Sequence, residues 1–257
     1  MREWLGFIAC CIAAYVMLVH TKDSFLSDSN GNAMVIVEPR KHAKLAYVLR
    51  NYDKNVDPSY TLYIFHGKSA GEFARDAAKD VTRRKVIYVP LKVDNLSADE
   101  YNALLKTPSF YDAIDAENIL IFQTDSVSCE KSPFRMKDFE EYGYVGCPYD
   151  NSIGKGVHWG ESNSFYGVGG LSFRQKSAAL ACIASEKTDA KFPEDVFFSN
   201  CVEKGYGRKP EHAGVLQSLC TQNYHGRPSF GVHKPELLQK DHVTALLEHC
   251  PESAELF

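Results

Sequence analysis

Short apolar runs alternate with helical patterns through the first half of the chain. Four runs rich in β-branched and aromatic residues are apolar at almost every position: 33–38, 61–66, 85–91 and 118–123. Runs of this kind are typical of strands that are covered on both faces. The intervening stretches carry helical spacing or a helix start, at Leu45–Tyr52, 72–80 and from Ser97 onward. The β-α-β-α order therefore predicts an α/β fold with a mostly parallel, doubly wound sheet.

The second half of the chain has a different pattern. Residues 150–170 are rich in Gly, Asn and Ser, which predicts a long loop over the edge of the sheet. Helical patterns follow near 175–187, 194–204 and 211–220. We predict one α/β domain over residues 34–257, with a more irregular C-terminal half.

An uncharged apolar segment, residues 4–21, precedes this domain. As a helix it would span roughly 27 Å, just short of a hydrocarbon core. Only Arg2 and Glu3 offer charge before it, and its end at 17–20 is a poor cleavage site, so we expect an uncleaved signal anchor at 1–21. A polar stem is expected at 22–33. A cleaved signal peptide, which would give a secreted protein, and a buried helix of the domain are the alternatives.

Charge and cysteine usage narrow the classes of protein. With 29 basic and 33 acidic residues the net charge is -4, so no nucleic-acid partner is expected. Apolar residues make up 44% of the chain, which excludes a disordered or multi-span membrane protein. The six cysteines outside the apolar segment form no CxxC pair. In a translocated domain they could form up to three disulfides, and the sequence does not tell which cysteines pair. The N-glycosylation pattern Asn95-Leu96-Ser97 fits a lumenal chain.

The fourth apolar run ends at a candidate cation ligand. Ligands collect at the carboxyl ends of strands in open α/β sheets, and Asp125 stands where this run stops. A carboxylate there can hold Mg²⁺ or Mn²⁺ against two phosphates, because these ions prefer hard oxygen ligands. The alternative is that Thr124, Asp125 and Ser126 cap the next turn.

Two later segments carry further candidate chemistry. Gly167, Gly169 and Gly170 allow the backbone to approach a ligand closely, or they form a tight turn into a strand. Glu194 and Asp195 begin a helix, where acids complement the helix dipole, and either could take a proton from a hydroxyl.

The last candidate segment contains a histidine and a lysine in an extended stretch. His233 could ligate a metal, and Lys234 could neutralise a diphosphate. A solvated loop is the alternative.

Eight segments, taken in order, resemble a known family: VIVEPRKHAKLAYVLRN, YIFHGK, YNALLKTPSFYDAI, ILIFQTDS, YGYVGCP, GGLSFR, PEDVFFS and FGVHKP. The family consists of glycosyltransferase-like proteins first catalogued as a domain of unknown function. The resemblance runs from about residue 34 to residue 236. It implies a single GT-A-like, Rossmann-like domain with a mixed sheet that binds a nucleotide sugar.

The resemblance also implies a donor site. Glu38 and Arg40, at the end of the first strand, would lie near the base or ribose. Residues 123–125 match the metal-binding DxD motif with glutamine in the first place, so Thr124 and Asp125 would lie at the diphosphate and Asp125 would bind Mn²⁺ or Mg²⁺. His233 would be a further metal ligand, and Lys234 would face the diphosphate.

An acceptor site and a base follow from the same resemblance. Gly169 and Gly170 would line the acceptor and the donor sugar, and Trp159 would stack on a sugar face or else anchor the loop. Inverting members of the wider fold carry an acidic pair at the start of a helix. On that pattern Asp195 is the expected base, with Glu194 as the second candidate.

We therefore expect an inverting glycosyltransferase that moves a sugar from a nucleoside-diphosphate sugar to a glycan or glycoprotein. A UDP-sugar is the expected donor. It would be a single-pass type II membrane protein of the Golgi or endoplasmic-reticulum lumen, held to the membrane by its N-terminal helix. The alternatives are a non-catalytic sugar- or nucleotide-sugar-binding module and a nucleotide-sugar hydrolase.

Overall fold

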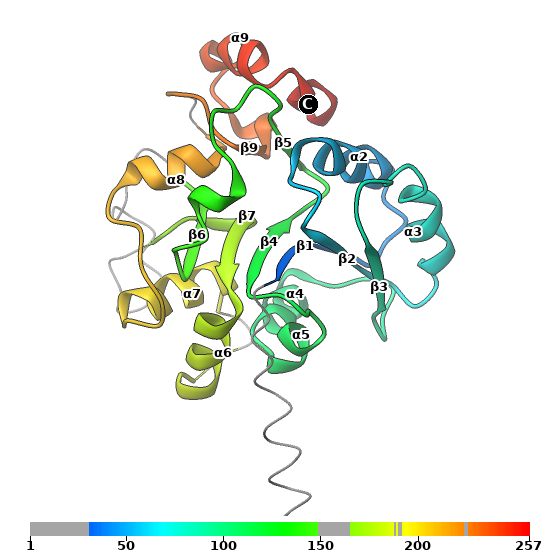
Figure 1. The fold of residues 1–257 in the computed structure, drawn as a ribbon, viewed down its shortest axis with the longest axis vertical. Helices are drawn as coiled ribbons and strands as arrows, with labels where there is room; N and C mark the ends of the chain where they lie inside the picture. Colours follow the sequence, from blue (N-terminus) through cyan, green and yellow to red (C-terminus); the bar gives the residue numbers. More distant parts are fainter. Residues whose placement is uncertain (1–30, 149–164, 188, 190–191, 224–225) are drawn as a thin grey trace, which may run out of the picture. The chain divides into compact units, whose positions relative to one another are not determined.

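A computed structural model describes residues 31–148, 165–187, 189, 192–223 and 226–257. Within this part six strands form one sheet in the order β3-β2-β1-β4-β7-β6 (Figure 1). Their bounds are β1 Asn32–Glu38, β2 Thr61–His66, β3 Val86–Pro90, β4 Asn118–Phe122, β6 Tyr144–Cys147 and β7 Val168–Gln175. The first four strands are parallel, whereas β7 runs antiparallel to both β4 and β6. The predicted α/β fold with a mostly parallel mixed sheet is confirmed.

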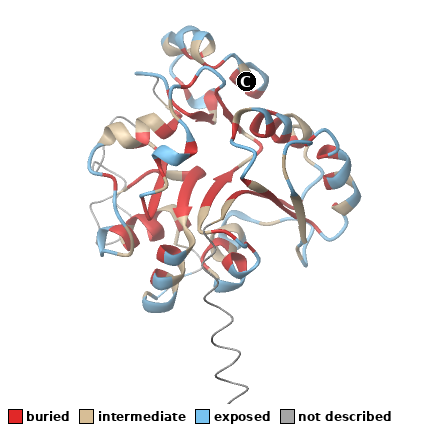
Figure 2. Cartoon of the chain, in the orientation of Figure 1, coloured by how far each residue is buried: buried red, intermediate tan, exposed pale blue. Residues whose placement is uncertain are grey.

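The central strands are apolar along their whole length because helices cover both faces of the sheet. In β1, Met34 and Ile36 pack into one core cluster, while Ala33, Val35 and Val37 pack into the other. All five side chains are buried, and the same strand is red in Figure 2. This two-sided burial explains why the strand shows no polar alternation.

The helices divide between these two clusters. The first cluster includes residues of α2 Leu45–Asn55, α3 Gly71–Ala77, α8 Ala213–Leu219 and α9 Lys240–His249. The second includes residues of α4 Ala98–Leu105, α5 Pro108–Asp112, α6 Lys176–Ser185 and α7 Glu194–Glu203. Helices were expected in the segments of α2, α3, α4, α6, α7 and α8, and the structure has each of them.

A smaller sheet, in the order β5-β9-β8, comes from the irregular second half. Its strands are β5 Ser126–Ser128, β8 Cys220–Thr221 and β9 Gly231–His233, and 3₁₀ helices lie at Met136–Asp138, Pro235–Leu237 and Pro251–Leu256. β5 follows the end of β4 directly and pairs antiparallel with β9, so that Ser126 lies opposite His233. This pairing brings the residue after β4 next to the end of β9.

The six cysteines in the described part are joined in three disulfides, Cys129–Cys250, Cys147–Cys220 and Cys182–Cys201. The first joins the segment after β5 to the end of α9. The second joins β6 to β8, and the third joins α6 to α7. The upper number of disulfides allowed by the sequence is therefore reached.

Two expectations about segment boundaries need correction. Gly169 and Gly170 lie inside β7 and not in a loop, because the strand begins at Val168. The last residues of the expected stem belong to β1, which starts at Asn32.

Two further expectations fall on residues that are not described. The expected anchor at 1–21 and Trp159 both lie outside the described residues. In the part of the chain that is described, none of the helices combines the length and apolar character that membrane crossing requires.

Candidate functional site

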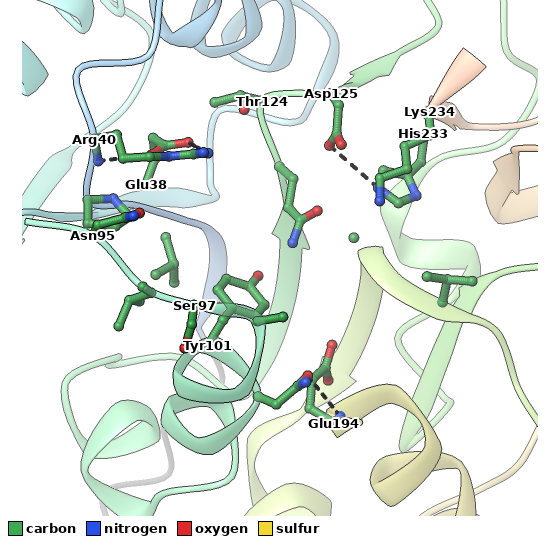
Figure 3. Close-up of a pocket in the computed structure, with 18 residues that line it drawn as sticks. Glu38, Arg40, Asn95, Ser97, Tyr101, Thr124, Asp125, Glu194, His233 and Lys234 are labelled. Atoms are coloured by element: carbon green, nitrogen blue, oxygen red, sulfur yellow. Dashed lines mark hydrogen bonds and ion pairs between the residues drawn. The ribbon is translucent and has the colours of Figure 1, made fainter. Parts of the chain in front are cut away.

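A cavity of about 330 Å³ lies at the carboxyl ends of β1 and β4, where the strand order places a ligand in an open α/β sheet (Figure 3). Eight of the residues expected at a site line it: Glu38, Arg40, Thr124, Asp125, Gly170, Glu194, His233 and Lys234. Gly169 and Asp195 are not among the lining residues. The cavity therefore gathers residues that lie up to 197 positions apart in the sequence, from Val37 to Lys234.

One wall of the cavity is an ion pair at the end of β1. Glu38 is 4% exposed, and its Oε1 accepts hydrogen bonds from the Arg40 backbone N–H at 2.9 Å and from Arg40 Nε at 2.8 Å. Its Oε2 accepts a third from an Arg40 terminal nitrogen at 2.8 Å. This bidentate pairing fixes the plane of the guanidinium at the cavity wall, where it can stack on a flat ring.

Asp125 and His233 face each other across another part of the cavity (Figure 3). Asp125 Oδ1 lies 3.5 Å from His233 Nε2, which is longer than an ordinary hydrogen bond. His233 Nδ1 lies 2.8 Å from the side-chain oxygen of Gln222. An amide oxygen only accepts, so the proton belongs on Nδ1, and Nε2 of the neutral ring presents a lone pair.

This arrangement fits a divalent cation. Asp125 Oδ1 and His233 Nε2 are both buried, and neither has a hydrogen-bond partner among the described residues. Two acceptor atoms this close repel unless a positive charge, a proton or a metal ion, lies between them. The hydrogen bond from His233 to Gln222 is also the kind of contact that orients a histidine ligand toward a metal.

The protein would supply only part of such a cation's coordination. Within the described residues no group of three or more His, Cys, Asp or Glu side chains could hold a metal ion. Mg²⁺ is commonly held by one or two protein ligands together with water and substrate phosphates. The donor set therefore suits a cation that arrives with a phosphate-bearing ligand.

Lys234 follows His233 in an unusual backbone conformation. Its φ is 48°, the left-handed region, and among the described residues it is the one non-glycine residue with a positive φ. Its N–H donates to the Asp125 carbonyl at 2.9 Å. The strained backbone thus ties Lys234 to the cation-ligand segment and keeps it at the cavity.

The two glycines of β7 make room for functional side chains. A Cβ on Gly169 would lie 1.8 Å from Glu194 Oε1, and a Cβ on Gly170 would lie 2.1 Å from His233 Nε2. The register between β6 and β7 shifts between Gly146 and Cys147, opposite these two residues. Glycine is needed here because an acid and a histidine approach the strand backbone closely.

The two acidic residues at the start of α7, Glu194 and Asp195, have different partners. Glu194 is 4% exposed and binds Arg174 at 2.6 Å, with Oε2 accepting from a terminal nitrogen. Burial raises the pKa of Glu194 to about 7, against the opposing charge of Arg174 and with a further rise from Asp195. Asp195 Oδ1 accepts from the Val196 N–H at 2.8 Å, and burial raises the pKa of Asp195 as well.

Several lining residues were not expected from the sequence. Asn95 and Ser97 precede α4, and Tyr101 and Asn102 lie within it. The sequence marked this stretch only by the N-glycosylation pattern at Asn95, by the helix start at Ser97 and by the segment YNALLKTPSFYDAI, none of which indicated a cavity. The Tyr101 hydroxyl is buried without a hydrogen-bond partner among the described residues. Arg174 belongs to the segment GGLSFR, but nothing in its local sequence indicates that it binds Glu194.

Comparisons with known proteins place the chain in a family. A search of curated proteins found no match. Among solved structures, the inositol-1-phosphate CTP transferase from T. maritima is similar with a TM-score of 0.48 and 12% identity, over 88% of this chain and 96% of that chain. Residues 83–233 match the family model described as "Protein of unknown function (DUF5672)". Since this match spans more than half of the 257 residues, from before β3 through His233, the chain belongs to the DUF5672 family.

Proposed function

We propose that this protein is a glycosyltransferase that moves a sugar from a nucleoside-diphosphate sugar, with UDP as the expected nucleotide, to a hydroxyl of a glycan or glycoprotein. The observation that carries the proposal is the content of one cavity. It is lined by Asp125 and His233, whose facing atoms are hydrogen-bond acceptors, by the positively charged Lys234 and by the buried Glu194. Transfer from such a donor needs a clamp for the diphosphate and a base for the acceptor.

The diphosphate would be held by charge. Lys234 offers a point charge to phosphate oxygens, and its backbone is fixed through Asp125. Asp125 Oδ1 and His233 Nε2 would hold Mn²⁺ or Mg²⁺, which when bound would neutralise negative charge on the leaving diphosphate. Gln123 lines the same wall, where the resemblance has an acid.

The nucleoside would lie along the ends of β1 and β4. Glu38 holds the Arg40 guanidinium flat at the wall, which suits stacking on a base. Thr124, which directly precedes Asp125 in the sequence, also lines the cavity. The sugar would then extend toward Gly170 and Glu194.

The base would come from the acidic pair at the start of α7. It takes the proton of the acceptor hydroxyl while that oxygen attacks the anomeric carbon from the face opposite the leaving diphosphate. A single displacement of this kind inverts the anomeric configuration. Asp195 is the base that the resemblance favours, and Glu194 is the second candidate.

We further propose that the domain works in the Golgi or endoplasmic-reticulum lumen, anchored through residues 1–21. The three disulfides support an oxidising compartment, since disulfides persist there and are rare in the cytosol.

The first test is donor binding and turnover with the full-length protein, a panel of UDP- and GDP-sugars, and assays with and without Mn²⁺. We expect one donor to release nucleoside diphosphate, faster when an acceptor glycan is present. Tight binding without turnover would favour a sugar- or nucleotide-sugar-binding module, and release that ignores the acceptor would favour a hydrolase. Binding of no donor would overturn the proposal.

Variants separate the diphosphate clamp from general effects. Asp125→Asn and His233→Ala should weaken donor binding in the presence of Mn²⁺ and reduce its dependence on the metal. Asp112→Asn, an exposed acid at the end of α5, is the matched control and should behave as wild type. Donor binding unchanged in both clamp variants would contradict the assignment of the cation site.

A further inference from the structure

A fully buried arginine is paired with one of the acids that line the cavity. Arg174, on β7, is 0% exposed, and its partner Glu194 lines the cavity. One terminal nitrogen of Arg174 donates to Glu194 Oε2 at 2.6 Å. The pair therefore joins the wall of the cavity to the interior of the sheet.

The guanidinium is fixed on several sides. It stacks over the ring of Phe198 at 4.7 Å and over the ring of Tyr144 at 5.3 Å. It also donates to the Tyr111 hydroxyl at 3.4 Å and to Ser172 Oγ at 3.2 Å. Such surroundings leave Arg174 one orientation, and so hold the Glu194 carboxylate in one place.

A buried ion pair is weak evidence for stability alone. Taking two charges out of water costs several kcal/mol per ion, and apolar residues often do as well in their place. Here the Glu194 carboxylate lines the cavity, so the pair presents a charged group to a ligand, which an apolar pair could not do.

The two acids of the pair at 194–195 differ in what their oxygens do. Glu194 Oε1 lies against Gly169 and accepts no hydrogen bond from the described residues, so it is available to a ligand. Asp195 does not line the cavity, and its Oδ1 already accepts from the Val196 N–H.

We propose that Glu194, and not Asp195, is the catalytic base, and that Arg174 is the positioning residue that holds this carboxylate in one place at the cavity. This inference rests on the proposed function, and it selects between the two acids that the sequence left open.

The step balances as a proton transfer coupled to a displacement. The acceptor O–H gives its proton to Glu194 Oε1, and the acceptor oxygen forms a bond to the anomeric carbon. The bond from that carbon to the phosphate oxygen breaks, and its electron pair leaves with the nucleoside diphosphate. The proton later passes from Glu194 to water.

Charged and titratable groups surround Glu194 from every neighbouring element: Arg174 on β7, Asp195 on α7, Lys106 after α4, Tyr101 on α4, Tyr111 on α5 and Tyr144 on β6. Burial raises the pKa of Glu194 most, and the positive charge of Arg174 opposes that rise. The result is a pKa of about 7, near the value that suits a base at neutral pH. Without the positive charge of Arg174 the pKa of Glu194 would be higher, so a smaller fraction of this carboxylate would be ionised at neutral pH and able to accept a proton.

The first experiment compares the two acids in the full-length enzyme. Glu194→Gln should lower kcat by at least about 100-fold, the usual contribution of a general base. Asp195→Asn should lower kcat far less than Glu194→Gln does, and it should move the acidic limb of the kcat/KM profile to lower pH, because the Asp195 charge raises the pKa of Glu194. Loss of turnover in Asp195→Asn with retention in Glu194→Gln would overturn the assignment.

The second experiment measures the Glu194 carboxyl directly, by ¹³C NMR titration of protein labelled at glutamate, with Glu194→Gln to assign the signal. Arg174→Lys keeps a positive charge but loses the forked donor geometry, so the pKa of Glu194 should rise and the acidic limb should move to higher pH. An unchanged pKa in a folded Arg174→Lys protein would contradict the role of Arg174.

These readouts separate this inference from the proposed function. If wild type turns over no donor, the glycosyltransferase proposal fails while the titration still tests whether Arg174 controls Glu194. If Arg174→Lys does not fold, the comparison of Glu194→Gln with Asp195→Asn still decides which acid is the base.

Discussion

At the residue scale, the cavity depends on the absence of a side chain at two positions of β7. Gly169 and Gly170 have no side chains, and the space is taken by Glu194 for one and His233 for the other. Two glycines expected at the end of a long loop thus lie in a strand, where the absence of a side chain lets Glu194 and His233 approach the backbone.

Alanine at each glycine should damage a different part of the site. Gly170→Ala places a Cβ 2.1 Å from His233 Nε2, so we expect weaker Mn²⁺ binding and an unchanged titration of Glu194. Gly169→Ala places a Cβ 1.8 Å from Glu194 Oε1, so we expect a changed Glu194 titration and unchanged Mn²⁺ binding. Calorimetry with Mn²⁺ and ¹³C NMR of the labelled glutamates check the pair. The same effect from both variants would show that the two glycines do not act separately.

Lys234 offers a second test at this scale, because its backbone and side chain have separable roles. Glycine adopts the left-handed region without strain, whereas alanine does not, so Lys234→Gly should be more stable than Lys234→Ala by about 1 kcal/mol. Both variants lose the ammonium group and should weaken donor binding equally. Urea unfolding and donor titration measure the two effects. Equal stabilities would argue against a strained backbone at this position.

At the element scale, α4 is the helix that positions the unexpected lining residues. Ser97 caps it through a capping box, in which the Glu100 N–H donates to Ser97 Oγ and the Ser97 N–H donates to the Glu100 carboxylate at 2.8 Å. Asn102 on this helix accepts a hydrogen bond from the Glu194 N–H at 3.1 Å. The middle of α4 is therefore linked directly to the start of α7.

Removing this cap should cost stability. Ser97→Ala should lower the free energy of unfolding by about 1 kcal/mol, the usual value for a lost N-cap. Ser97→Thr keeps the hydroxyl and is the matched control, with a smaller loss expected. Guanidinium unfolding of the three proteins gives the comparison. A Ser97→Ala protein as stable as wild type would mean that the capping box contributes nothing here.

At the scale of the whole molecule, the disulfides fasten the elements that carry the site. Cys182–Cys201 joins α6 to α7, the helix that begins with Glu194. Cys147–Cys220 joins β6 to β8, and β8 lies beside β9 with its His233. The two sheets and the site are thus held by covalent bonds as well as by the core.

Deleting one bridge tests how much the molecule depends on them. A bridge that closes a loop of about 15 residues is worth about 3 kcal/mol by chain entropy. Cys182 and Cys201 are separated by 19 positions, so the double alanine variant should lose about this much stability. Chemical unfolding checks this, with oxidised wild type as the reference. A double variant as stable as oxidised wild type would show that packing alone holds α7.

Much of the architecture was predictable because burial leaves a pattern along the chain. The four runs of apolar residues are the four parallel strands, and burial on both faces explains β1, β2 and β4. The expectation was wrong for β3, which is only partly buried because it lies at the edge of the sheet. Asp125 was also predictable, because a polar residue directly after a buried strand must lie at the sheet's edge. The role of Gly169 and Gly170 was not, because a glycine shows only that a side chain is missing and not which group takes its place.

The sequence by itself determined the order of strands and helices, the fold class and most of the acidic and basic residues that line the cavity. These follow from local periodicity and from residue type. Only the tertiary structure decided which of them meet: the pairing of β5 with β9 places His233 at Asp125, and the approach of α7 to β7 places Arg174 at Glu194. Contacts between residues 20 to 108 positions apart depend on strand pairing and helix packing, and those leave no mark at either residue alone.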